Sequence, residues 1–285
     1  MITEPDLLGL LQPEKVGDNA FQGTSLPLAS PSIYGGQLMA QVLSVAASTL
    51  PQPRPAHYLQ TSFVAFGDPT GALQFQVTRT RDGRSTSHRH VEVQQEGRTL
   101  LLASLSFQST DEGFDHQVDM PTVPAPHTLE NDSANYISFA APDGDFPFVI
   151  LNCPDIGAPG EAVASIWAKP RETAPSGDLL HQMLFAFMSD ATILQSALLP
   201  HNLDWEESGI FVATMNHSIW FHRAMDINNW LLLHGESPST SQGRALSIAN
   251  AFSASGELLA TVAQEGTLRR KSALTSAHAL GSNSH

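Results

Sequence analysis

The pattern of apolar and polar residues changes character several times along the chain. Two stretches, 35–50 and 178–199, are apolar on nearly every side and almost free of charge, which indicates buried helices. A shorter helix is expected over 5–12, and from 56 to 109 the chain alternates with the period of strands. Further strands are expected near 161–169, 209–222, 227–237, 239–253 and 256–268.

Turn-forming residues separate these elements. Asp82-Gly83, between two β-favouring runs, predicts a hairpin. Residues 110–160 are rich in Pro, Asp and Gly, which favours a connector with little regular structure, and the small polar residues after Lys271 favour a disordered tail. The predicted units are an N-terminal one over 1–110, the connector over 111–160, a C-terminal unit over 161–271 and the tail over 272–285.

The two halves of the chain resemble each other. RTLLLASLSFQ (98–108) matches GELLATVAQEG (256–266) in outline, and in each half a long helix precedes the strands. The spacing of roughly 155 residues suggests a duplicated unit, a helix followed by an antiparallel meander. Because such a helix must bury its apolar surface against the strands, two units side by side predict one long sheet carrying two helices.

The composition of the chain excludes several classes of partner and site. The formal net charge of −14 argues against a nucleic-acid partner, because phosphate binding needs a basic surface. A single cysteine, Cys153, excludes an internal disulfide and a cysteine-rich metal site. The first residues are acidic where a signal peptide would be basic, and no apolar run approaches the ~18 residues of a membrane span. We therefore expect a cytoplasmic protein without membrane insertion.

Motifs of common catalytic sites are absent from the sequence. There is no G-x-S-x-G elbow, no H-E-x-x-H, no paired Cys/His spacing, and no G-x-G-x-x-G or P-loop. The sequence therefore predicts no metal and no nucleotide-binding fold. Any chemistry must come from less conspicuous residues.

One carboxylate lies in an apolar setting. Asp190 is the only formal charge between His181 and Pro200, and a charge inside a buried helix is costly unless it is paired or functional. Two structural readings compete with a functional one. Ser189 or Asp190 could be the N-cap of a helix that starts later, or Asp190 could belong to a structural hydrogen-bond network.

Two polar strand residues are less informative. Gln264 ends an apolar strand face formed by Leu258, Ala260 and Val262, and backbone groups at the end of a sheet could satisfy it. Thr214 is explained by strand propensity alone. Strict alternation places Thr214 on one face with Val212, Asn216, Ser218, Trp220 and His222, and His217 on the other with Ala213, Met215, Ile219 and Phe221.

Six segments together resemble the bacterial acyl-CoA thioesterase II family. They are SIYGGQLMAQVL (32–43), RTRDGRSTSHRHVEV (79–93), ASLSFQSTDEGFDHQVDMP (103–121), FMSDATILQSAL (187–198), ATMNHSIWFHR (213–223) and QEGTLR (264–269). The resemblance implies an α+β double hotdog, in which two tandem antiparallel sheets each wrap around a central helix. It also implies hydrolysis of fatty acyl-CoA to free fatty acid and coenzyme A, with no cofactor because coenzyme A belongs to the substrate.

The resemblance also implies which residues are catalytic. The family's catalytic residues are an Asp, a Thr or Ser, and a Gln. They correspond here to Asp190, Thr214 and Gln264, so all three are present. Asp190 is then the general base for a water molecule that Thr214 and Gln264 orient. The histidines of the same strand, His217 and His222, are interpreted as structural.

Substrate contacts are less defined. Gly35 and Gly36 would allow a ligand to approach the start of the first long helix, although crowding between helix and strand explains them equally well. Arginines that could contact the phosphates of coenzyme A are Arg79, Arg89 and Arg269. Where the family usually has Arg and Pro after its first long strand, this chain has Ala65 and Phe66, which removes a cation and a rigid turn from a segment that could contact the substrate.

Two other functions compete with hydrolysis. A double-hotdog enoyl-CoA hydratase would need a D-x-N-P-x-H loop, which the sequence lacks. A non-catalytic acyl-CoA-binding or sensor protein could share the fold, although the complete trio argues against it. A homo-oligomer is expected because exposed sheet edges and flat hotdog faces favour pairing.

Overall fold

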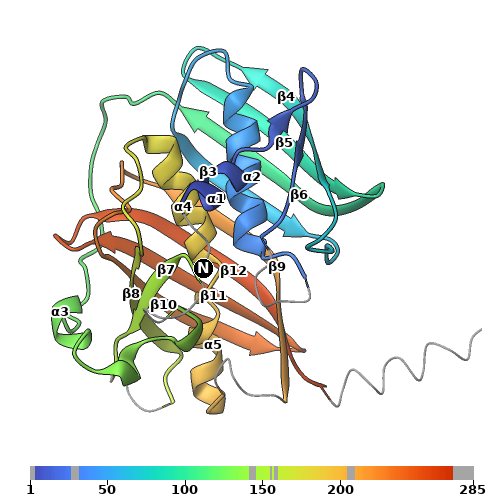
Figure 1. The fold of residues 1–285 in the computed structure, drawn as a ribbon. Helices are drawn as coiled ribbons and strands as arrows, with labels where there is room; N and C mark the ends of the chain where they lie inside the picture. Colours follow the sequence, from blue (N-terminus) through green and yellow to red (C-terminus); the bar gives the residue numbers. More distant parts are fainter. Residues whose placement is uncertain are drawn as a thin grey trace, which may run out of the picture.

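A computed structural model describes residues 4–26, 32–140, 146–154, 156, 160–203 and 209–271. Figure 1 shows two curved halves of a β-sheet, each with its own helices, that lie side by side and are joined at their edges. The order of the strands is β1-β2-β4-β5-β6-β3-β9-β12-β11-β10-β8-β7, and each neighbouring pair is antiparallel. The described part of the chain therefore forms one twelve-stranded sheet.

The two halves repeat the same arrangement. The elements of the first half are α1 (Glu4–Leu10), β1 (Glu14–Lys15), β2 (Ala20–Gly23), α2 (Gly35–Ser48), β3 (Ala56–Phe63), β4 (Leu73–Asp82), β5 (Thr86–Gln95) and β6 (Arg98–Gln108). Those of the second half are β7 (Phe148–Asn152), β8 (Val163–Pro170), α4 (Asp178–Ser189), α5 (Gln195–Leu198), β9 (Ile210–Phe221), β10 (Leu231–Ser241), β11 (Arg244–Ser253) and β12 (Leu258–Arg270). Between them lie α3 (Pro126–Leu129) and short 3₁₀ turns at Ser133–Asn135 and Ser138–Ala140; a third, Leu199–His201, follows α5. The predicted duplication is confirmed, because the order β4-β5-β6-β3 in one half matches β10-β11-β12-β9 in the other.

The halves meet at the paired strands β3 and β9. Their register runs from Tyr58 opposite Trp220 to Ser62 opposite Asn216. One continuous apolar core extends across this junction and includes residues of both long helices. The double hotdog expected from the sequence is therefore observed as two half-sheets that share one core.

The helix α2 is buried almost completely, as its lack of charge predicts. Its two glutamines lie in the core, and both are hydrogen bonded: Gln37 Oε1 accepts from the N–H of Leu26 at 2.9 Å, and Gln41 Nε2 donates to Leu10 O at 2.9 Å. Buried amides are tolerated when they are satisfied in this way. The helix ends at Ser48, three residues before Pro51.

The two long helices contact each other closely at one point. Tyr34, just before α2, donates its hydroxyl hydrogen to the carbonyl of Phe187 in α4 at 2.7 Å. A Cβ on Gly36 would lie 2.1 Å from that carbonyl oxygen. Glycine at this position therefore allows the start of α2 to approach the end of α4, where Asp190 lies.

Two sequence expectations differ from the structure, one is confirmed and one falls outside the described residues. The helix expected over 178–199 ends at Ser189, because Ala191 N–H bonds back to Met188 O, three residues earlier, and the tighter turn stops the α-helical ladder. The connector is more regular than expected, since it contains β7, which pairs with β8. The Asp82-Gly83 hairpin is confirmed, with Gly83 N–H bonded to Thr86 O at 2.8 Å. The expected tail, 272–285, lies outside the described residues.

Candidate active site

Asp190, Thr214 and Gln264 meet at one point, although they lie far apart in the sequence. Thr214 donates its hydroxyl hydrogen to Asp190 Oδ1 at 2.9 Å. Gln264 Nε2 lies 2.8 Å from the same carboxylate oxygen and 2.8 Å from Thr214 Oγ1. The three side chains come from the end of α4, from β9 and from β12. The structure therefore brings together the complete trio expected from the sequence.

The Asp190 carboxyl group is buried, and this changes its acidity. Its side chain is only 6 % exposed. Burial raises its pKa from 3.8 to about 6, whereas hydrogen bonds from Thr214 and from the N–H of Gly36 oppose the rise. A carboxylate with such a pKa is still mostly ionised at pH 7 and is a stronger base than an ordinary aspartate.

The N-terminus of α2 faces this carboxylate. The residue before the helix, Tyr34, makes no side-chain capping bond, and the N–H of Gly36 donates to Asp190 instead. A Cβ on Gly35 would lie 2.7 Å from Asp190 Oδ2 and 3.0 Å from the ring of Phe63. Both glycines expected at the site are therefore present there, and the space that they leave is filled by Asp190 and by Phe187.

Thr214 reaches the trio because β9 contains a bulge. The register of β9 against β12 shifts between Glu265 and Gly266, which pair with Asn216 and Thr214, so Met215 has no partner. The strict alternation assumed from the sequence is wrong here. The bulge turns Thr214 to the inner face of the sheet, the face of His217, whereas Asn216 stays on the outer face, a use of bulges common beside active sites.

The two histidines occupy different environments. His217 is fully buried, its Nδ1 lies 3.8 Å from Asp190 Oδ1, and its Nε2 lies 3.1 Å from the hydroxyl of Ser189. Burial lowers the pKa of His217 to about 3, so the ring is neutral. His222 lies on the exposed side of the sheet, with Nε2 2.9 Å from Thr261 Oγ1.

We expect that neither histidine is needed for turnover. His217→Gln should lower stability because the ring is fully buried, and His222→Gln should change little. Turnover per folded molecule should stay within about tenfold of wild type in both, less than a general base is worth. Thiol-release assays normalised to the folded fraction check this. If folded His222→Gln lost as much activity as a variant of Asp190, the assignment of the base would be wrong.

The three candidate arginines lie in different places. Arg89 is 1 % exposed and bonds to Thr49 Oγ1 and Asp82 Oδ1, both at 2.8 Å, so it has a structural role. Arg79 donates to Asn19 Oδ1 at 2.7 Å in the first half of the sheet, away from the trio. Only Arg269 lies near the site, because in the pairing of β12 with β9 it lies opposite Phe211.

A cavity of about 370 Å³ opens next to the trio. Its lining combines Asp190, Ala191, Leu194, Ile210, Phe211, Val212, Ala213, Thr214, Gln264 and Lys271. Sequence reasoning missed Lys271, because it directly follows the last strand and only the position of β12 beside β9 brings it to the site. The lining of the cavity thus includes a buried base, several apolar side chains and an exposed cation.

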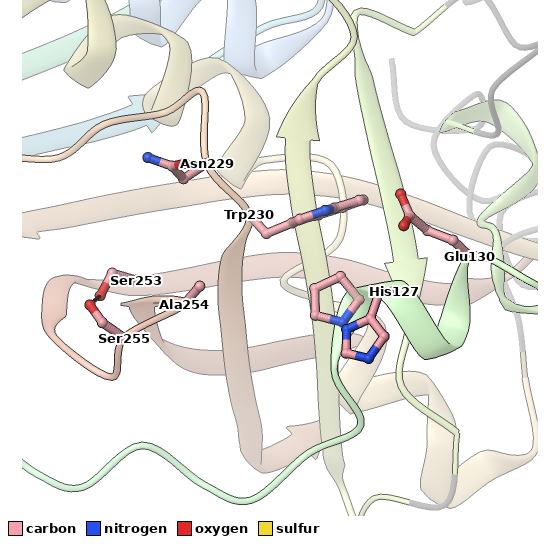
Figure 2. Close-up of a pocket in the computed structure, with 8 residues that line it drawn as sticks. His127, Glu130, Asn229, Trp230, Ser253, Ala254 and Ser255 are labelled. Carbon is pink, nitrogen blue, oxygen red and sulfur yellow. Dashed lines mark hydrogen bonds between the residues drawn. The ribbon is translucent and has the colours of Figure 1, made fainter.

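A second hollow, of about 420 Å³, lies elsewhere (Figure 2). It is formed by Trp230, the turn at 253–255, His127 of α3 and Glu130, which directly follows α3. Glu130 is exposed, and Lys169 Nζ lies 4.5 Å from the centre of the Trp230 ring. The hollow contains none of the trio, so it is not the candidate active site.

The described ranges contain no group of three or more His, Cys, Asp or Glu residues that could hold a metal ion. Within the same ranges, no helix is both long and apolar enough to cross a membrane.

Comparisons with known proteins show the family of the chain. Residues 154–267 match the family model described as acyl-CoA thioesterase, and residues 25–108 match that of the acyl-CoA thioesterase N-terminal domain. Acyl-CoA thioesterase 2 of Haemophilus influenzae is 35% identical over 93% of this chain and 97% of its own. Human acyl-coenzyme A thioesterase 8 is 30% identical over 92% of this chain and 88% of its own.

Solved structures show the same fold. The crystal structure of an acyl-CoA thioesterase II from Mycobacterium marinum superimposes with a TM-score of 0.80, at 31% identity, over 93% of this chain and 98% of that one.

Proposed function

The chain belongs to the acyl-CoA thioesterase family and is an acyl-CoA thioester hydrolase, and from this premise we propose that its substrates are fatty acyl-CoAs and that Asp190, Thr214 and Gln264 direct a water molecule onto the thioester carbonyl. The observation that supports this mechanism is the contact of all three side chains at one buried carboxylate beside a cavity. The reaction as proposed needs no cofactor.

The proposed reaction begins with Asp190 accepting a proton from the water as its oxygen bonds to the carbonyl carbon. Gln264 Oε1 is buried and has no partner among the described residues, so it can accept the other hydrogen of this water. Thr214 holds the carboxylate in place through its hydrogen bond. When the tetrahedral intermediate collapses, the C–S bond breaks and the thiolate takes the proton from Asp190, which gives free acid and coenzyme A.

The negative charge that develops on the carbonyl oxygen needs a positive partner. The N-terminus of α2 lies at the site, and the amino end of a helix carries partial positive charge. Charge stabilisation of this kind is commonly the largest contribution to catalysis. We therefore propose that α2 both holds Asp190 and supports the oxyanion.

Coenzyme A release from palmitoyl-CoA and from shorter acyl-CoAs tests the function. A thiol reagent should report one free thiol per acyl-CoA consumed. An enoyl-CoA hydratase would change the acyl group and leave the thioester intact, and a binding protein would release no thiol above the buffer rate. Either of those results with folded wild-type protein would contradict the proposed hydrolysis.

Location and assembly are further parts of the proposal. A cytoplasmic site of action is supported by the free, buried thiol of Cys153. A homo-oligomer is supported by large apolar side chains exposed on the sheet, such as Trp220 and Leu102, which are 39 % and 48 % exposed. A role in fatty acid metabolism follows from the proposed substrates.

A further inference from the structure

One edge of β9 is unpaired next to the catalytic trio. The pairing of β3 with β9 ends at Ser62 opposite Asn216. Beyond that point the N–H groups of Val64 and Ala65 both donate to Leu100 O, so the chain turns toward β6. Residues 210–215 of β9 therefore have β12 on one side and, among the described strands, no partner on the other.

The hydrogen bonds show which backbone groups face the free edge. Lys271 N–H donates across the pair to Gly209 O at 2.9 Å, whereas Leu268 N–H points the other way, to Gly243 O at 2.9 Å. Hydrogen-bonded and non-bonded pairs alternate in an antiparallel ladder. Val212, the partner of Leu268, therefore directs its N–H and C=O to the free edge, and the alternation gives the same direction at Ile210 and Thr214.

The cavity follows this edge from the reactive centre to a cation. Asp190, Thr214 and Gln264 line one part of it, and Ile210 and Lys271 line another. From Thr214 to Ile210 the strand rises by about 13 Å at ~3.3 Å per residue. The formal net charge of the chain is −14, so an exposed lysine beside the cavity is a local exception in an acidic protein.

We propose that the pantetheine arm of acyl-CoA lies extended along this edge, with its amides bonded to the backbone of Ile210, Val212 and Thr214 and the phosphates of coenzyme A facing Lys271. This subsite rests on the proposed function. The arm carries two secondary amides, each with the donor and acceptor of a peptide group, and spans about four extended residues, roughly 13 Å. An unpaired strand edge binds such groups through its main chain.

An aromatic pair borders the same path. The ring of Phe211, which lines the cavity, lies 6.3 Å from the ring of Phe66 in an edge-to-face arrangement. Phe66 comes from the first half and is 60 % exposed. The pair gives the apolar parts of the arm, its methylenes and its geminal methyl groups, a wall between the two halves.

The backbone contact is tested on the substrate side, which leaves the protein unchanged. S-acyl-N-acetylcysteamine keeps the first amide of the arm, and the matched S-acyl thioester of 2-acetoxyethanethiol has an ester in its place. We expect kcat/KM of the wild-type enzyme to be about fivefold to tenfold lower for the ester, the loss of one net hydrogen bond. Their alkaline hydrolysis rates provide the correction for intrinsic reactivity. Equal corrected values would overturn the edge contact.

The cation is tested with Lys271→Gln, using acyl-CoA and the acyl-pantetheine that lacks its phosphates. We expect KM for acyl-CoA to rise about fivefold at low salt, the scale of an exposed ion pair, and KM for acyl-pantetheine to stay unchanged. Lys15→Gln is the control, because Lys15 is exposed on β1 at the far end of the sheet. An equal effect on both substrates, or no effect, would overturn the phosphate contact.

These outcomes separate the subsite from the function. A wild-type protein that releases no thiol from any acyl-CoA refutes the proposed function. A wild-type protein that hydrolyses acyl-CoA but is indifferent to the amide and to Lys271 refutes the subsite alone.

Discussion

Asp190→Asn should give a folded protein whose kcat for acyl-CoA hydrolysis is lower by about 10²-fold or more, the usual scale for the loss of a general base. The amide has nearly the shape of the carboxyl group and keeps one acceptor oxygen for Thr214, but it cannot take a proton from water. Substrate binding should be largely retained. Steady-state thiol release, with folding checked by circular dichroism, measures the effect.

Asp178→Asn is a matched control for this variant. Asp178 lies at the other end of the same helix, where its side chain is exposed. Its replacement should leave kcat near the wild-type value. Near-normal turnover in folded Asp190→Asn would remove Asp190 from the role of base.

Asp190 should also make the stability of the protein depend on pH. Its pKa is about 6 in the folded state and 3.8 in the unfolded reference. The folded state binds this proton more tightly, so the contribution to stability is fully present below pH 3.8 and is lost as the pH rises through about 6. At about 1.4 kcal/mol for each pKa unit, the loss approaches about 3 kcal/mol at pH 7.

Other carboxylates titrate as well, so the comparison must be made against Asp190→Asn. Burial opposes the shift at Asp82, but hydrogen bonds from Arg89 and Ser87 leave its pKa below the ordinary value, and hydrogen bonds from Gln94 and Thr99 lower the pKa of Glu92. Both carboxylates therefore act in the opposite direction. The difference in unfolding free energy, wild type minus variant, cancels those contributions and should fall by about 2 kcal/mol between pH 4 and pH 7. Chemical denaturation at several pH values measures it. A difference that does not vary with pH would mean that the carboxyl group is not buried as described.

The sequence predicts the elements of this fold better than the details of its site. The helices and strands follow from apolar patterning, and the duplication follows from the repeated order of elements. The break after Ser189 could not be predicted, because Asp190 is held by groups from α2, β9 and β12 that are remote in the sequence.

Two features of the site depend on tertiary structure alone. The bulge at Met215 changes which face of the sheet Thr214 occupies. The strand β9 contains no glycine, so its sequence gives no sign of the bulge. Lys271 enters the cavity only because β12 lies beside β9. Conversely, the guanidinium group of Arg89 could bind a phosphate by its chemistry, but it is buried and hydrogen bonded to Thr49 and Asp82. Patterning cannot distinguish these cases, because it carries no information on what packs against a given face.

The nature of the nucleophile is the central question about the mechanism. Thr214 donates its hydrogen to Asp190, so a covalent route, in which Asp190 activates Thr214 and an acyl-enzyme forms, is geometrically conceivable. We favour water because a carboxylate is a poorer match than a histidine for activating a hydroxyl group. Thr214→Ala should accordingly retain more turnover than Asp190→Asn.

Rapid quench of wild-type enzyme with saturating acyl-CoA tests this most directly, with coenzyme A release followed before the first turnover and the peptide containing Thr214 examined by mass spectrometry. Water attack predicts no burst of coenzyme A and no acyl adduct, because no covalent intermediate forms. An acyl group on Thr214 that forms and decays as fast as the enzyme turns over would contradict the account and establish the covalent route.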